Sequence, residues 1–133
     1  MSLAQTICFR NNCYVKHILK FFDITNISIN KFLYLFELFN NEYKNANDKE
    51  KVIDTVVEFA IKNNRIELLF FLEKYLNTSE DCGDYCKISA QYGRLNFLKW
   101  FRKRNFPWNK LTCSEAAENG HLECLIWARQ NGC

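Results

Sequence analysis

Hydrophobic positions near the C-terminus recur at helical spacing and in paired segments. Within 121–130, Leu122 and Leu125 lie three residues apart, which is typical of one face of an amphipathic helix. The segment before it, 111–119, carries small apolar residues that allow a neighbouring helix to approach closely. Gly120 separates the two segments, and glycine favours the left-handed conformation that ends many helices. The pattern therefore predicts two helices joined by a tight turn.

This pattern repeats along the chain. Residues 86–102 align without gaps on 113–129, at an offset of 27 (113 − 86). A weaker copy, 60–72, aligns on 89–101 at an offset of 29 (89 − 60), with Asn64 in place of glycine. The identical pairs of the two clear copies are Cys86/Cys113, Ala90/Ala117, Gly93/Gly120, Leu95/Leu122, Leu98/Leu125, Trp100/Trp127 and Arg102/Arg129. One helix pair cannot bury its own apolar face, whereas stacked copies can, so the repeats favour a solenoid.

Upstream of the two clear copies, the sequence predicts helices and loops with less precise bounds. The predicted helices cover 6–22 (one or two helices), 29–43 and 50–63. Polar loops are predicted over 45–51, with Asp48 as the N-cap of the next helix, and over 77–81. Asparagine tolerates left-handed backbone and is expected to end helices where glycine is missing. The predicted organisation is a divergent helical N-terminal cap or degenerate repeat over 1–48 and one continuous repeat domain over 49–133, with units of about 50–80, 82–108 and 109–133.

The repeat register also predicts the core. Apolar residues at equivalent positions of stacked units should meet at the contacts between units. The residues expected to be buried there are Ala90, Leu95, Leu98, Ala117, Leu122 and Leu125.

Composition supports a helical, globular chain. The 133 residues are 48% hydrophobic, which suits one domain with a sizeable core. Sandwiches and barrels use more turn residues than the four glycines and one proline present, so the predicted fold class is all-α. The net charge of +3 is mild for a dedicated nucleic-acid binder.

Targeting signals are not evident in the sequence. The first six residues lack the basic and apolar regions of a secretory signal. The longest strongly apolar stretch, 32–39, is far shorter than the ~20 residues needed to span a bilayer, so we expect no membrane association. Seven cysteines, an odd number, argue against a secreted disulfide framework. We therefore expect reduced, mostly buried thiols and a cytoplasmic location.

Residues 116–123, Ala-Ala-Glu-Asn-Gly-His-Leu-Glu, resemble the ankyrin repeat. Residues 106–113 and 125–133 are similar to its Cys-Pro-Trp and Trp-Ala-Arg-x-Asn-Gly-Cys variant, which is frequent in giant DNA viruses of amoebae and in some algae and oomycetes. The chain departs from the family where Leu111-Thr112 stands in place of the usual Thr-Pro and where Glu115 replaces a usual leucine. The units are also shorter than ~33 residues, so we expect no well-formed β-hairpins.

Candidate catalytic and metal-binding groups have simpler explanations. Cys82 and Cys86 form a C-x3-C pair, with Cys113 and His121 downstream, and zinc needs four such ligands. However, Cys86 and Cys113 are equivalent repeat positions, which packing explains. The resemblance implies that His121 is a structural residue that links turns, and His17 has no evident nucleophile beside it. We predict no metal, no cofactor, no catalytic residue and no enzyme activity.

A basic run interleaved with aromatic residues is the strongest candidate binding signal. Such residues can neutralise phosphates and stack on bases, but they also form solvated helix faces with the aromatic rings turned inward. The second explanation is favoured over nucleic-acid binding. The candidate partner-binding residues are Arg94, Lys99, Arg102, Lys103, Arg104, Trp108 and Lys110, and the structural repeat positions are Ala90, Gly93, Leu95, Leu98, Trp100, Ala117, Gly120, His121, Leu122, Leu125 and Trp127.

The expected function is protein–protein interaction through the stacked first helices and the loops between units. The family resemblance implies a partner in the host cell cytoplasm if the protein is viral. The alternatives are a basic nucleic-acid-binding module and a structural, self-assembling protein. An apolar face on the last unit, which includes Leu125 and Trp127, also predicts end-to-end self-association or a partner docking there.

Overall fold

The computed structural model describes residues 30–31, 34, 36–37, 46–78 and 84–133, and every regular element in these ranges is helical. The predictions for residues 6–22, including His17, lie outside the described residues, as do Cys82 and residues 79–81 of the predicted second loop. The chain divides into two compact units, 1–55 and 56–133. The elements are α4 (Ala46–Lys62), α5 (Glu67–Leu72), the 3-10 helix η1 (Glu73–Tyr75), α6 (Tyr85–Gln91), α7 (Leu95–Lys103), α8 (Lys110–Glu118) and α9 (Leu122–Gln130).

None of the described helices is long and apolar enough to cross a bilayer. Helix α4 begins at Ala46, so Asp48 lies inside it. The prediction of Asp48 as an N-cap and of a loop over 45–51 is therefore wrong, because the polar residues of this segment continue the helix. A side-chain N-cap is found on helix α8, where the Asn109 side-chain oxygen accepts a hydrogen bond from the Leu111 amide at 2.8 Å.

The first helix of each pair ends at a left-handed residue, as predicted. These residues are Asn64 (φ 55°), Gly93 (φ 66°) and Gly120 (φ 73°). The amide that follows each of them donates to the carbonyl five residues back at 2.8 Å, in the bonds Arg65 to Ala60, Arg94 to Ser89 and His121 to Ala116. This is the Schellman termination of a helix, and asparagine supports it where glycine is absent.

The second helices of the last two pairs, α7 and α9, end in the same way. Asn105 (φ 62°) and Gly132 (φ 87°) are left-handed and lie 27 residues apart (132 − 105). The amides that follow them donate five residues back, at 3.1 Å and 3.0 Å, in the bonds Phe106 to Phe101 and Cys133 to Ala128. The backbone therefore repeats at both ends of the helix pairs, with the offset found in the sequence.

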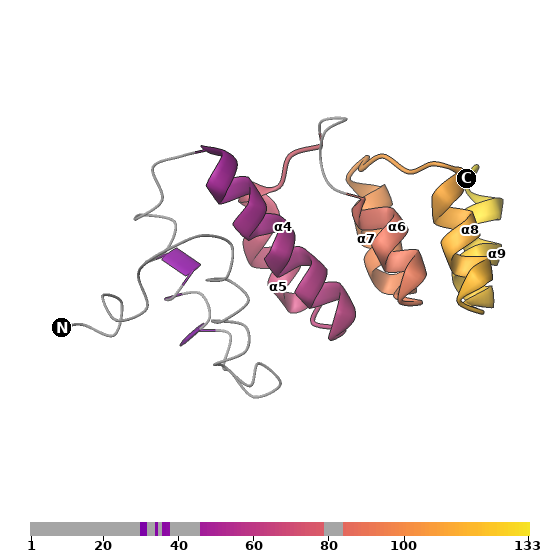
Figure 1. The fold of residues 1–133 in the computed structure, drawn as a ribbon, viewed down its shortest axis with the longest axis horizontal. Coiled ribbons are helices and arrows are strands. Elements are labelled where there is room, and N and C mark those ends of the chain that lie inside the picture. The colour runs from indigo at the N-terminus through magenta and orange to yellow at the C-terminus, as the bar shows by residue number, and fades with distance from the viewer. Residues whose placement is uncertain (1–29, 32–33, 35, 38–45, 79–83) are drawn as a thin grey trace. The chain divides into compact units, whose positions relative to one another are not determined.

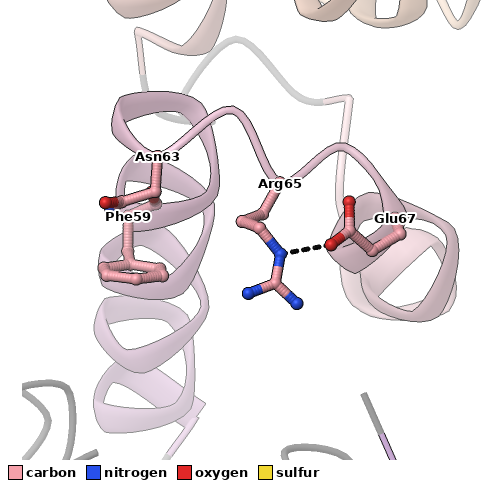
Figure 2. A network of polar contacts seen from close by, with 4 residues as sticks. All are labelled: Phe59, Asn63, Arg65 and Glu67. Atoms are coloured by element: carbon pink, nitrogen blue, oxygen red, sulfur yellow. Dashed lines mark hydrogen bonds and ion pairs between the residues drawn. The ribbon is translucent and has the colours of Figure 1, made fainter. Parts of the chain in front are cut away.

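A short turn joins α4 to α5, and Figure 2 shows its polar contacts. The Asn63 side chain donates to the carbonyl of Phe59 at 3.0 Å, one turn back in α4. Arg65 donates from Nε to the Glu67 carboxylate at the start of α5. Burial, the largest single influence, raises the pKa of Glu67. The hydrogen bond from Arg65, a backbone hydrogen bond and the charge of Arg65 together outweigh burial and lower that pKa.

Within residues 56–133 the helices pack as two neighbouring pairs, visible in Figure 1. Helix α6 packs against α7 and α8 against α9, while α6 also contacts α8 and α7 contacts α9. Aromatic rings fill the α6/α7 pair: the centroid of Phe101 lies 5.2 Å from those of Tyr85 and Phe106 and 5.3 Å from that of Trp100. First helix therefore lies against first helix, and second against second.

Burial differs between the two pairs in a systematic way. Some equivalent positions are buried in both copies, namely Tyr85/Thr112, Ser89/Ala116, Phe97/Cys124 and Phe101/Ala128. Other positions are buried only in the α6/α7 pair: Ala90 and Leu98 are 0% exposed, whereas Ala117 is exposed and Leu125 half-buried. Because α8/α9 packs against α6/α7, we attribute the burial of this second set to that packing.

The core prediction is confirmed for Ala90 and Leu98 and wrong for Ala117 and Leu122. Leu122 is 63% exposed, and its equivalent Leu95 is half-buried. The reason is that equivalent backbone positions have a neighbouring helix pair in one case and solvent in the other.

Candidate interaction surface

In the α6/α7 pair and in the α8/α9 pair, one side chain forms hydrogen bonds with the end of the preceding first helix. Nε2 of His121 lies 3.0 Å from the carbonyl oxygen of Gln91, at the end of α6. Arg94, at the equivalent position one unit earlier (121 − 27), donates from Nε to the carbonyl of Ile61 at 3.0 Å and from Nη2 to that of Lys62 at 2.9 Å. The acceptors are also equivalent, since Gln91 aligns on Lys62 (91 − 29). The same contact therefore recurs between successive units.

The His121 imidazole lies so close to residue 93 that only glycine fits there. A Cβ added to Gly93 would lie 2.4 Å from Nδ1 of His121 and 2.7 Å from its Cε1, well inside contact distance. The equivalent Gly120 has nothing within 4 Å of such an atom. Gly93 is thus required both by its left-handed backbone and by the ring of the next unit.

Two further arginines hold side chains within the repeats. Arg104 donates from Nε to the Glu73 carboxylate in η1, and its guanidinium carbon lies 3.8 Å from the centroid of Trp100. Trp100 is 7% exposed, and its indole nitrogen has no hydrogen-bond partner among the described residues. The guanidinium of Arg102 lies 4.4 Å from the centroid of Trp108 and donates to the carbonyl of Phe106.

The predicted binding run therefore separates into two groups. Arg94, Arg102 and Arg104 make internal contacts, and Trp108 is half-buried against Trp127, with ring centroids 5.8 Å apart. The remaining three, Lys99, Lys103 and Lys110, are exposed, although Lys99 Nζ lies 6.0 Å from the Trp127 centroid. The expected inward orientation of Trp100 and Phe101 is confirmed.

The cysteines of the described residues lie in packed surroundings. Cys86 and Cys124 are buried, and Cys113 and Cys133 are half-buried. Burial, together with a hydrogen bond to the Cys113 thiol, raises the pKa of Cys133 to about 11. In the ranges 46–78 and 84–133, no group of three or more His, Cys, Asp or Glu side chains is placed to hold a metal ion.

The sequence prediction missed the roles of Arg94 and Arg104. Arg94 could have been identified, because the repeat alignment places it at the position of His121. Arg104 could not, because its partner Glu73 lies in a segment without a recognisable equivalent.

No protein-family model, curated protein or solved structure matches this chain. The resemblance to ankyrin repeats therefore rests on the residues of the sequence alone.

Proposed function

We propose that the C-terminal helix pairs are ankyrin-like repeats forming a short solenoid, and that this solenoid is a non-catalytic module that binds another protein. The observation that carries the proposal is the recurring contact from Arg94 and His121 to the preceding unit. It fixes the stacking of successive pairs, so that exposed side chains are held on a rigid support. Solenoids of this kind bind partners over extended surfaces.

The titratable groups of the repeats support a non-catalytic role. The Nε2 atom of His121 is engaged by a backbone carbonyl, and the guanidinium of Arg94 by two. Arg104 is shared between Glu73 and Trp100. His121, Arg94 and Arg104 are thus used to hold the units together.

The first helices provide the surface proposed to recognise the partner. The buried position shared by Ser89 and Ala116 is small and 0% exposed in both copies. Outward positions of α6 and α8 differ instead: exposed Asp84 aligns on Leu111 (84 + 27). A repeated backbone with varied outward side chains is suited to recognition of one particular protein.

Affinity capture from host cytosol tests the proposal. The full chain is compared with Asp84→Lys/Lys87→Glu, which exchanges the charges of a pair 3.6 Å apart on α6 while keeping the net charge. Glu123→Lys/Arg129→Glu, which exchanges two exposed charges on the second helix α9 and keeps the net charge, is the control. A protein retained by the wild type and the control but lost by the exchange variant supports the function. Retention by all three chains, or release by nuclease treatment, contradicts it.

Nucleic-acid binding is the second candidate. The observation that favours it is that 85–114 contains seven basic residues and no acidic one: Lys87, Arg94, Lys99, Arg102, Lys103, Arg104 and Lys110. Against it, Trp100, Phe101 and Phe106 are buried and offer no stacking surface.

The salt dependence of binding separates the two candidates. If the three exposed lysines of the run each neutralised a phosphate, the logarithm of the affinity for single strands would fall with a slope of about −2 against the logarithm of salt concentration. A titration of labelled single-stranded RNA and DNA at several salt concentrations measures this slope.

A further inference from the structure

Three basic side chains of α7, Lys99, Arg102 and Lys103, form a cluster without an acidic partner among the described residues. Arg102 and Lys103 follow Lys99 by three and four residues, so both are its neighbours on the helix surface. Both lysines are exposed, and Arg102 is half-buried. Like charges at this spacing destabilise a helix unless an anion lies near them. We call these three residues the α7 basic cluster.

The α6/α7 pair has a neighbouring unit on each side. On one side Arg94 bonds to the end of α4 and Arg104 to η1, and on the other His121 of the next pair bonds to the end of α6. Lys99 and Lys103 are exposed although both of these neighbours are in place. The α7 basic cluster is therefore an outward feature of a stacked unit.

The neighbouring second helices bring no free carboxylate to the cluster. Equivalent helices of stacked units pack side by side, so aligned positions are neighbours. In α9 the positions aligned with the cluster at the offset of 27 are neutral or basic, namely Ile126, Arg129 and Gln130. In the preceding unit, at the offset of 29, Glu73 aligns on Arg102, but its carboxylate accepts from Arg104. The positive charge of the cluster is thus uncompensated within the described part of the chain.

Two indole rings position the cations of the cluster. The guanidinium of Arg102 lies 4.4 Å from the centroid of Trp108, and Nζ of Lys99 lies 6.0 Å from that of Trp127. The two rings pack edge to face, with centroids 5.8 Å apart. One nitrogen of Arg102 donates to the carbonyl of Phe106, and its other guanidinium nitrogens have no hydrogen-bond partner among the described residues. A guanidinium fixed in this way is preorganised to donate to a carboxylate.

We propose that the α7 basic cluster binds an acidic segment of the partner protein, whose Asp or Glu carboxylates pair with Lys99, Arg102 and Lys103. The planar guanidinium of Arg102 holds one carboxylate, and the flexible lysines pair with others. The inference rests on the proposed function. It specifies the chemistry of the partner and adds a contact on a second helix to those proposed for the first helices.

The aromatic surroundings favour an acidic peptide over a nucleic acid. Single-stranded nucleic acids gain much of their affinity by stacking bases on exposed rings. Here Trp100 is buried, Trp108 packs beneath Arg102, and Trp127 packs against Trp108. An acidic peptide needs the charges of the cluster and no stacking surface, so it matches what the unit presents.

Fluorescence anisotropy of labelled octaglutamate, titrated with the full chain up to about 1 mM, tests the proposal. Octaglutamate should bind saturably, and the neutral peptide octaglutamine should not bind. Lys99→Gln/Lys103→Gln should weaken binding about 3- to 30-fold, because each exposed ion pair contributes modestly. The matched control, Lys31→Gln/Lys51→Gln, removes the same charge from two exposed lysines outside α7 and should bind like the wild type. Thermal unfolding checks that both variants are folded.

Three results would overturn the proposal: no binding of octaglutamate, equal weakening by both variants, or tighter binding of an oligouridylate with the same net charge. Failure of this inference can be told apart from failure of the proposed function. A chain that captures a protein through α6 but does not bind octaglutamate refutes the acidic partner alone. A chain that binds octaglutamate but captures no protein refutes the proposed function alone.

Discussion

Replacement of Gly93 by alanine tests the inter-unit contact directly. Its Cβ would lie 2.4 Å from Nδ1 and 2.8 Å from Cγ of His121, so the imidazole could not keep its place. Gly120→Ala is the matched control, because residue 120 has the same kind of backbone (φ 73°, against 66° at residue 93) and nothing within 4 Å of an added Cβ. The two substitutions share the backbone cost and differ in the collision.

The expected losses of unfolding free energy follow from the backbone cost and from the collision with His121. A left-handed alanine costs about 1–2 kcal/mol, which is the whole effect expected for Gly120→Ala. Gly93→Ala adds about 1–3 kcal/mol for overpacking and about 1 kcal/mol for the hydrogen bond between His121 and Gln91. The expected total is about 3–6 kcal/mol, so the two variants should differ by about 2–4 kcal/mol.

Urea and thermal unfolding followed by circular dichroism measure both variants and a double-mutant cycle with His121→Ala. Once the imidazole is removed, Gly93→Ala should cost no more than Gly120→Ala, which gives a coupling of about 2–4 kcal/mol between residues 93 and 121. Equal costs for the two glycine substitutions in the wild-type background would refute the reasoning. So would a Gly93→Ala penalty that survives in the His121→Ala chain.

Three further predictions concern the core, acid stability and thiol chemistry. Leu98→Ala should cost about 2–5 kcal/mol in urea unfolding, whereas Leu122→Ala, at a site 63% exposed, should cost well under 1 kcal/mol; similar costs would contradict the burial pattern. The hydrogen bond from Arg104 lowers the pKa of Glu73 below 4.5, so its stabilisation is present above that pH and lost as pH falls through the lowered pKa. The difference in thermal midpoint between wild type and Glu73→Gln should therefore shrink towards pH 3, and a constant difference would exclude this ion pair as its source. Because the pKa of Cys133 is about 11 rather than 9.0, iodoacetamide at pH 8 should alkylate it about 100-fold more slowly in the folded chain than in urea, and rates within a few-fold of each other would contradict its placement.

Much of the backbone of the repeats could be predicted from the sequence, because helix ends depend on local chemistry. Gly93 and Gly120 mark left-handed stops, and Asn64 occupies the same place because asparagine tolerates that conformation. The start of α4 was less predictable. Polar residues around Asp48 suit a loop or a solvated helix turn equally well, and only the structure distinguishes the two.

Side-chain surroundings were harder to predict than the backbone, because sequence identity between repeats does not imply identical neighbours. Ala90 and Ala117 occupy the same backbone position, yet the first is fully buried and the second exposed. What differs is whether another helix pair lies against that face. A repeat alignment therefore predicts which faces could form contacts, and the exposed fraction shows which of them lack one.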